Sequence, residues 1–260
     1  MSTPPQDVVP LGEGFWNLRG SFRIGPVDIG THASLCRLES GRYVLLDAIR
    51  FSSAQESWLR EMTEGGAALE AVLNVHPFHT VFCASAHRLF PDAAHHGTAR
   101  HHRKLPEVPW AELRTEDEAL HARYAADFAF SVPAGVDFIP ANENLHFASV
   151  IALHRASRTI HVDDTFGVQK APPFLRKPGN QLVSVHPTLP LVLEPTREAV
   201  PAFRDWGDLF VSLAGDADQL AAAHDGILRP RRGEPSVRDR VGKALATVEP
   251  LLRLHERRHR

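Results

Sequence analysis

Histidines and an aspartate stand where apolar segments of this sequence begin or end. His76 and His79 follow one apolar segment. His146 begins a second apolar segment, and Asp164 comes after a third. Imidazole nitrogens and carboxylate oxygens are ligands of catalytic zinc sites, which leave one position open for water and lower its pKa towards neutrality. We therefore predict a metal site that activates water, with Asp164 and His79 as its catalytic residues.

The last ligand is predicted at His224, which ends a helix-like segment, and His186 is its alternative. Asp163 stands beside Asp164, and either carboxylate can bind the ion while the other orients a ligand histidine. With these two choices left open, the predicted metal ligands are His76, His79, His146, Asp164 and His224.

Histidine is abundant in this chain, which has 16 such residues. Four of them lie close together, at positions 95, 96, 101 and 102, in a segment that we expect to form a surface loop running to Pro109. His101 or His102 could fill a vacant ligand position. The histidines expected to be structural are His87, His121, His154 and His161.

Alternating strands and helices must position these residues. Apolar runs bounded by Gly, Pro and Asn predict strands, and apolar residues at helical spacing predict helices. The predicted strands are 15–23, 31–38, 42–47, 69–75, 128–132, 136–139, 147–154 and 158–162. The predicted helices are 53–65, 80–91, 115–124, 201–206, 217–224 and 236–253. This order indicates an α/β fold in which two sheets pack face to face with helices outside.

Length and composition allow one large domain. The 260 residues are 43% hydrophobic, which is enough for a full core. We expect a flexible segment at 1–14, a single domain at 15–253 and a basic tail at 254–260. An irregular proline-rich stretch is expected at 171–179.

Charge and motifs exclude several classes of function. The formal net charge of -2 gives no reason to bind nucleic acid or an anionic membrane. The sequence also lacks a membrane-span pattern, a secretory leader, a glycine-rich phosphate loop and a Gly-x-Ser-x-Gly nucleophile motif. Cys36 and Cys83 lie in strand-like apolar runs and are expected to be small buried thiols. We expect a cytoplasmic protein with a small-molecule substrate.

Three segments resemble the metallo-β-lactamase superfamily. The segment 41–47 resembles the family's early strand, which ends on an acid that supports the metal loop. The block 146–166 resembles the part in which a ligand histidine precedes two strands and a metal-bridging aspartate, so His146 and Asp164 take those places. His224, followed by Asp225 and Gly226, resembles the late histidine. The resemblance implies a four-layer αββα sandwich.

The central motif departs from the family pattern. The family has His-x-His-x-Asp-His, whereas this chain has His76-Pro77-Phe78-His79-Thr80-Val81 and lacks the motif's aspartate and last histidine. The resemblance is therefore to a divergent, uncharacterised branch with a degenerate motif. It implies one zinc ion, or iron or manganese in its place, and hydrolysis of an ester, amide, thioester or phosphoester. Two alternatives are a non-catalytic binding protein that has lost part of its metal site, and an iron site with redox chemistry.

Overall fold

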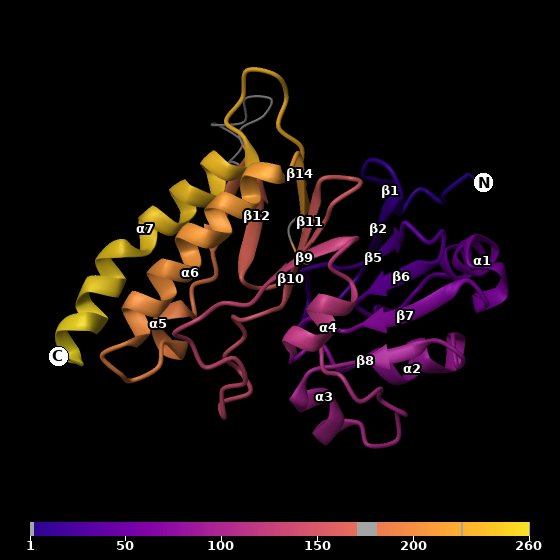
Figure 1. Ribbon diagram of the computed structural model, residues 1–260, viewed down its shortest axis with the longest axis horizontal. Coiled ribbons are helices and arrows are strands. Elements are labelled where there is room, and N and C mark those ends of the chain that lie inside the picture. Colours follow the sequence, from indigo (N-terminus) through magenta and orange to yellow (C-terminus); the bar gives the residue numbers. More distant parts are fainter. Residues whose placement is uncertain (1–2, 171–180, 225, 260) are drawn as a thin grey trace.

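The computed structural model describes residues 3–170, 181–224 and 226–259. Two β-sheets lie face to face, and helices cover the outer face of each sheet (Figure 1). The proline-rich stretch predicted at 171–179 and Asp225 lie outside the described residues.

The first sheet has six strands in the order β1-β2-β5-β6-β7-β8. β6, β7 and β8 are parallel, and the other neighbours are antiparallel. The strands are β1 (Val8–Pro10), β2 (Phe15–Gly20), β5 (Thr31–Arg37), β6 (Tyr43–Leu46), β7 (Leu69–Leu73) and β8 (Ala94–His96). Helix α1 (Ser53–Met62) connects β6 to its parallel neighbour β7, and Ser52 and Gln55 form a capping box at its start. A short 3-10 helix, η1 (Glu64–Gly66), follows α1.

The second sheet has five strands in the order β15-β14-β11-β10-β9. β11 and β14 are parallel, and the remaining pairs are antiparallel. The strands are β9 (Phe128–Ser131), β10 (Ile151–His154), β11 (Thr159–Val162), β14 (Gln219–Ala222) and β15 (Gly226–Leu228). The helices near this sheet are α5 (Leu189–Val192), α6 (Ala199–Leu213), the 3-10 helix η3 (Ala214–Asp216) and α7 (Val237–Arg258).

Three apolar cores fill the spaces between the four layers. Trp58 and Leu59 of α1 pack on Leu35 of the first sheet. The inter-sheet core includes residues of both sheets, among them Cys36 and Ala152. The third core joins the second sheet to α6 and α7 and includes Ile160, Phe210 and Val241. The four-layer αββα sandwich implied by the resemblance is therefore confirmed.

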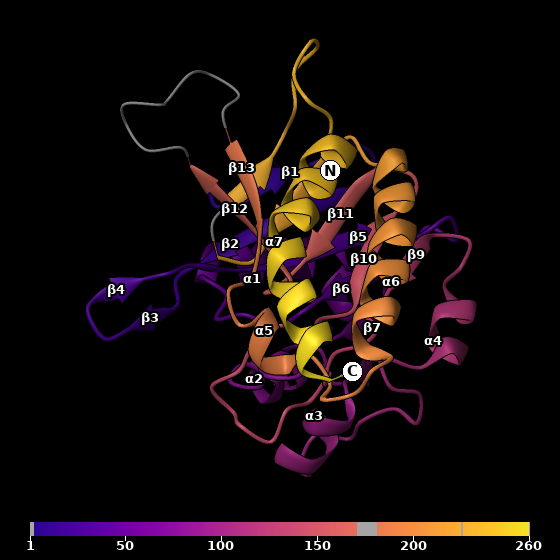
Figure 2. The same ribbon diagram turned by 90° about the vertical axis from the view of Figure 1, so that its left-hand side faces the viewer.

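Two hairpins and three short helices complete the described chain. The hairpin of β3 (Arg23–Ile24) and β4 (Val27–Asp28) projects from the body, and β12 (Phe166–Lys170) pairs with β13 (Gln181–Val185) (Figure 2). The short helices are α2 (Cys83–Leu89), α3 (Ala99–Lys104) and α4 (Glu118–Arg123). No helix among the described residues is long and apolar enough to cross a membrane.

The helix predicted at 217–224 is wrong, because Gln219–Ala222 forms strand β14. Its alanines favour a helix in isolation, but the segment pairs with β11 on one side and with β15 on the other. Leu220, Ala221 and Ala222 are fully buried there. Burial on both faces within the sheet therefore outweighs the local preference.

The surface loop predicted around the four clustered histidines is also wrong. This segment contains β8 and α3, and His95, His96 and His101 are all buried. Backbone oxygens bond one nitrogen in each of two rings: His95 Nε2 bonds Phe90 O at 3.0 Å and His96 Nδ1 bonds Leu113 O at 2.7 Å. Burial of these histidines is tolerated because polar partners lie within the protein.

Element boundaries differ from the prediction at three further places. The segment expected to be flexible at 1–14 contains β1, which pairs with β2, and the fully buried Leu11. Helix α7 continues beyond the expected boundary at 253 to Arg258. The strand predicted at 136–139 is reduced to one isolated bridge between Val136 and Leu193, because prolines at 133 and 140 flank it.

Candidate metal centre

Strand directions bring the predicted site residues to one edge of the sandwich. β6 and β7 are parallel, so Asp47 after β6 and His76 after β7 emerge on the same side. β11 and β14 are parallel as well, which places Asp164 and His224 together. β10 runs antiparallel to β11, so His146, which precedes β10, arrives at the same edge. A backbone hydrogen bond of 2.9 Å from Val150 N to Val75 O joins the two sheets beside this point.

Four imidazole rings surround the carboxylate of Asp164. Asp164 Oδ2 lies 3.2 Å from His76 Nε2, 3.6 Å from His79 Nε2 and 3.6 Å from His146 Nδ1. Asp164 Oδ1 lies 2.8 Å from His224 Nε2. The structure thus brings together all five residues expected to bind metal, and we call this group the Asp164 cluster.

Two buried atoms of the Asp164 cluster have no hydrogen bond in the described part of the chain. These atoms are His76 Nε2 and Asp164 Oδ1, and their nearest partners make ion-pair contacts of 3.2 Å and 2.8 Å rather than hydrogen bonds. The Asp164 residue is only 5% exposed, so bulk water does not compensate for the missing bonds. A bound cation would satisfy the free carboxylate oxygen, and Asp164 and the surrounding imidazoles are ligand types that zinc and similar ions take, so the donor set fits a metal ion.

Backbone oxygens orient two of the four rings. His146 Nε2 donates to Glu143 O at 2.8 Å, and His224 Nδ1 donates to Gly30 O at 2.9 Å. In the neutral form each ring then has a free lone pair on the nitrogen that faces Asp164. Metal-binding histidines usually have this arrangement, with the second nitrogen donating to a carbonyl or carboxylate.

The ring of His79 lies between the two adjacent aspartates. His79 Nδ1 is 3.5 Å from Asp163 Oδ2, while its Nε2 faces Asp164. This is an ion-pair distance, and it matches the carboxylate–histidine pairing found behind many metal ligands. Of the two candidate acids, Asp164 therefore faces the cluster directly and Asp163 lies behind His79.

The ring of His76 differs from those of His146 and His224, because its nitrogen that faces Asp164 carries the proton. Its Nδ1 accepts a hydrogen bond of 3.2 Å from Phe78 N. A neutral ring in this position must carry its proton on Nε2, which points towards Asp164. In this tautomer His76 is a donor towards the carboxylate, and binding a cation through Nε2 would require the proton to move to Nδ1, with loss of the hydrogen bond from Phe78 N.

Charges and burial explain the protonation of the cluster without metal. Burial lowers the pKa of His76 well below its ordinary value, and the neighbouring His79 adds to this effect. Burial opposes the charge on His79 as well, but Asp163 and Asp164 outweigh it and hold the pKa of His79 well above its usual range. Despite its burial, Asp164 has a pKa well below the ordinary value, because His76 and the other histidines stabilise the carboxylate.

A second group of similar residues lies deeper, between the sheets. Its members, which we call the inter-sheet cluster, are His32, Asp47, His161 and Asp163, all at most 1% exposed. His161 Nε2 bonds Asp47 Oδ2 at 2.9 Å, and His32 Nε2 bonds Asp163 Oδ1 at 3.2 Å. The two imidazoles stack with centroids 4.1 Å apart and an angle of 10° between planes. One ligand-type atom from each member lies within 4.8 Å of the others, so this group has metal-site spacing too.

Sequence reasoning missed His32 and treated His161 only as a structural residue. Both lie inside strands, whereas the prediction considered residues at the ends of strands. The available signal was a period of two: His32 and Ser34 alternate with the apolar Ala33 and Leu35 in β5. Polar residues on one face of a fully buried strand indicate a polar layer between sheets.

The alternative ligands lie elsewhere. His186 Nδ1 pairs with Thr188 Oγ1 at 2.8 Å, while His224 is the residue in contact with Asp164. His101 Nδ1 accepts from Thr98 N at 3.0 Å and belongs to the cap of α3. Both cysteines are buried free thiols, as their apolar surroundings predicted.

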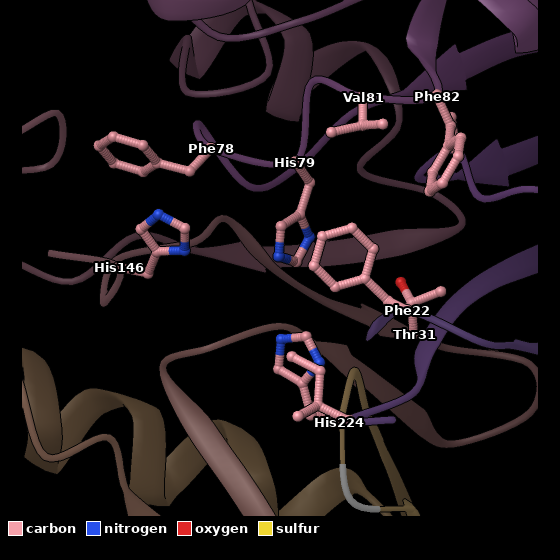
Figure 3. A pocket seen from close by; sticks show the side chains of 10 residues that line it. Phe22, Thr31, Phe78, His79, Val81, Phe82, His146 and His224 are labelled. Atoms are coloured by element: carbon pink, nitrogen blue, oxygen red, sulfur yellow. The ribbon is translucent and has the colours of Figure 1, made fainter. Parts of the chain in front are cut away.

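An apolar pocket opens beside the Asp164 cluster. His79, His146 and His224 form part of its wall, and Phe22 and Phe82 lie on the side away from His146 (Figure 3). The pocket encloses about 540 Å³ including its open mouth, and its exposed lining is mainly apolar. The candidate centre is therefore accessible to a small molecule with an apolar group.

Comparison with known proteins identifies the fold. No protein-family model and no curated protein matches the sequence. A metallo-β-lactamase from Erythrobacter litoralis with β-mercaptoethanol in its active site matches with a TM-score of 0.60 and 12% identity, covering 94% of this chain and 99% of that chain. The metallo-β-lactamase FIM-1 from Pseudomonas aeruginosa in its mono-zinc form matches with a TM-score of 0.54 and 10% identity, covering 94% and 98%. The chain therefore has the metallo-β-lactamase fold, with a sequence far diverged from these enzymes.

Proposed function

We propose that this chain is a metal-dependent hydrolase that uses one metal ion, with zinc as the first choice. The observation that carries the proposal is the convergence of three imidazole nitrogens within 3.6 Å of Asp164 Oδ2. Unsatisfied buried atoms in the same cluster support it. Iron and manganese remain alternatives, because imidazole and carboxylate ligands also suit these ions.

The proposed ligands are His79, His146, His224 and Asp164, whose free atoms face one another. His76 would join them if its proton moved from Nε2 to Nδ1, so that Nε2 offered a lone pair. The ion would act as a Lewis acid and lower the pKa of a bound water molecule. One ion is favoured over two because Thr80 and Val81 replace the motif's aspartate and last histidine. A structural neighbour solved in a mono-zinc form is consistent with one ion.

The residues of the chain have separate roles in this proposal. Asp164 would hold the ion through one carboxylate oxygen and accept or return a proton at the other, and Asp163 pairs with His79 Nδ1. The pocket side chains exclude water from the site around the substrate, which strengthens electrostatic interactions within it. General acid–base transfer by such positioned groups contributes roughly 10²–10⁴-fold to rates.

The pocket favours a carbonyl substrate with an apolar group. Phe22, Phe78 and Phe82 present aromatic surface beside the histidines, and the described residues that line the pocket include no lysine or arginine. A phosphoester would lose hydration at such a wall without gaining a lysine or arginine partner from the pocket lining. We therefore propose an ester, thioester or amide as substrate, in preference to a phosphoester. Two buried thiols fit our further proposal of a cytoplasmic location.

A non-catalytic binding protein is the second candidate. The observation that favours it is the ring of His76, whose Nδ1 accepts from Phe78 N and whose Nε2 must then carry the proton. In this reading Asp164 is held by its histidines alone, and the apolar pocket binds a small molecule without converting it.

The test is hydrolysis by protein purified without a histidine tag and supplied with zinc, manganese or iron. We expect hydrolysis of p-nitrophenyl esters that improves from acetyl to longer acyl chains, with little cleavage of bis(p-nitrophenyl) phosphate. Asp164→Asn should abolish the activity, whereas His154→Gln, which changes a buried histidine away from the site, should retain it. Metal binding without hydrolysis of any ester, thioester or amide would favour the binding protein, and no metal binding would overturn the metal-site proposal.

A further inference from the structure

We propose that His32 and His161 are positioning residues, and that two parallel hydrogen-bonded rows hold the two ends of the segment that carries His76 and His79. One row is Asn17–His32–Asp163, and the other is Ser34–His161–Asp47. This inference deepens the proposed function and rests on it, because the segment held in this way supplies ligands of the Asp164 cluster.

The hydrogen bonds of the first row all run from Asn17 towards Asp163. Asn17 Nδ2 lies 3.0 Å from His32 Nδ1, and the same nitrogen reaches Ala33 O at 3.3 Å and Ser34 Oγ at 3.0 Å. Ala33 O can only accept and Arg19 donates to Asn17 Oδ1, so the amide nitrogen faces His32 Nδ1 and shares its two hydrogens among the three acceptors. The neutral ring then carries its proton on Nε2, which donates to Asp163 Oδ1 at 3.2 Å.

The second row repeats the pattern beside the first. Ser34 Oγ lies 2.9 Å from His161 Nδ1, and it accepts from Asn17, so its own proton is free to go to His161. His161 Nε2 then donates to Asp47 Oδ2 at 2.9 Å. His32 comes from β5 of the first sheet and His161 from β11 of the second, so the stacked rings also join the sheets.

The two rows end at opposite ends of the same short segment. Asp47 Oδ1 accepts from Val75 N at 2.9 Å, directly before His76. Asp163 Oδ2 faces His79 Nδ1 at 3.5 Å. Asp47 has a φ of 60°, a conformation that residues with a side chain rarely adopt, and its two carboxylate contacts hold it there. The segment is therefore hydrogen-bonded at its start through the backbone, and at its end the ring of His79 makes an ion-pair contact with Asp163.

The same hydrogen bonds argue against a second metal ion between the sheets. The four atoms have suitable spacing, but both Nε2 atoms carry the protons that bond the aspartates. A cation there would displace the two hydrogen bonds to the aspartates. It would also require both rings to change tautomer, with the proton moving from Nε2 to Nδ1. The inter-sheet cluster is thus an outer support of the Asp164 cluster, and outer partners of this kind typically change metal affinity about 10–100-fold when removed.

The first measurement uses the unaltered, metal-free protein labelled with ¹⁵N. Ring-nitrogen chemical shifts should show the proton of both His32 and His161 on Nε2. A proton on Nδ1 of either ring would overturn the rows. Because this readout needs no metal, it decides the inference even if the proposed hydrolase function fails.

The second measurement compares His32→Leu with His32→Gln by cobalt titration. Leucine removes the donor to Asp163, and we expect about a 10–100-fold loss of cobalt affinity. Glutamine can place an amide N–H near the position of Nε2, and we expect it to restore most of the affinity. His154→Gln serves as the matched control, because His154 is equally buried but bonds Arg37 O and Ser157.

Equal cobalt affinity in His32→Leu and the unaltered protein would contradict the positioning role. A loss of the same size in both His32 variants would contradict it as well, since the restored donor should matter. If His32→Leu does not fold, Asn17→Leu removes the donor at the start of the row instead. Its predicted signature is a His32 ring that no longer keeps the proton on Nε2 alone, and an unchanged ring would overturn the role of Asn17.

Discussion

The Asp164 cluster and the inter-sheet cluster both consist of histidines and aspartates, and they meet at the adjacent residues Asp163 and Asp164. Their hydrogen bonding nevertheless differs. In the inter-sheet cluster both histidines bond an aspartate, and each second nitrogen has a partner. In the Asp164 cluster the rings crowd one carboxylate, and buried atoms are left without hydrogen bonds. Ligand types and spacing alone would mark both as metal sites. The inter-sheet cluster also has one such atom, Asp163 Oδ2, so the difference lies in the imidazoles, which are hydrogen-bonded through both nitrogens there and crowd a single carboxylate in the Asp164 cluster.

The largest effect on stability is expected in the inter-sheet cluster. His161→Leu leaves the carboxylate of Asp47 buried without its partner, so the free energy of unfolding of the metal-free protein should fall by about 3–5 kcal/mol. Urea denaturation measures this change. Asp164→Asn should cost less under the same conditions, because the neutral and nearly isosteric amide leaves no buried carboxylate without its partner. A larger loss of unfolding free energy for Asp164→Asn than for His161→Leu would contradict the expected difference between the two clusters.

For metal affinity we expect the reverse order, with larger effects from substitutions in the Asp164 cluster than from those in the inter-sheet cluster. Asp164→Asn removes the proposed ligand, so cobalt affinity should fall by more than about 100-fold, above the 10–100-fold range for outer partners. Isothermal titration with cobalt provides the measurement. An Asp164→Asn protein that binds cobalt as tightly as the unaltered chain would place the ion elsewhere.

Metal removal should affect only a protein with an intact Asp164 cluster. With zinc at 100 times its dissociation constant, binding should add about 2.7 kcal/mol to the free energy of unfolding, and a chelator should remove this increment. Thermal unfolding with and without chelator tests it. Asp164→Asn should show no such difference, and a chelator effect of equal size in that variant would be inconsistent with the assignment.

The smallest effect is a pH dependence of opposite sign in the two clusters. Burial, with His161 next, holds the pKa of His32 well below 6.5, so this residue's contribution to stability is lost as pH falls below 6.5. Asp163 and Asp164 outweigh burial and raise the pKa of His79 above 6.5, so its contribution is complete below 6.5 and is lost as pH rises through the raised value. Metal-free protein should therefore be most stable near pH 6.5, as measured by urea unfolding. Stability that increases steadily from pH 5 to 9 would contradict the shift at His79.

The sequence predicted the site better where it depended on strand ends than where it depended on tertiary contacts. His76, His79, His146 and Asp164 border apolar runs, and strand direction alone brings such ends to one edge. His32 lies inside a strand, and only the packing of the second sheet places it against Asp163. Ring polarity is also beyond the sequence, because it depends on partners such as Phe78 N.

The fold, too, was predicted better from local sequence patterns than where it depends on tertiary contacts. The order of strands and helices was sufficient to predict two layered sheets, and the resemblance supplied the four layers. The segment 217–224 was mistaken for a helix because its alanines favour one, whereas its partners β11 and β15 are set by the tertiary structure. His224 still reached the site, because a strand end and a helix end both deliver the residue that follows them.

The most direct test of the central claim is to locate metal by anomalous diffraction at the zinc edge, in crystals grown with zinc and without a histidine tag. We expect one ion bound by Asp164 and the surrounding histidines, at about 2.0–2.2 Å from their nitrogen and oxygen atoms. We expect no ion between His32 and His161. A peak in the inter-sheet cluster, or no peak at Asp164, would show that the metal site is wrongly assigned.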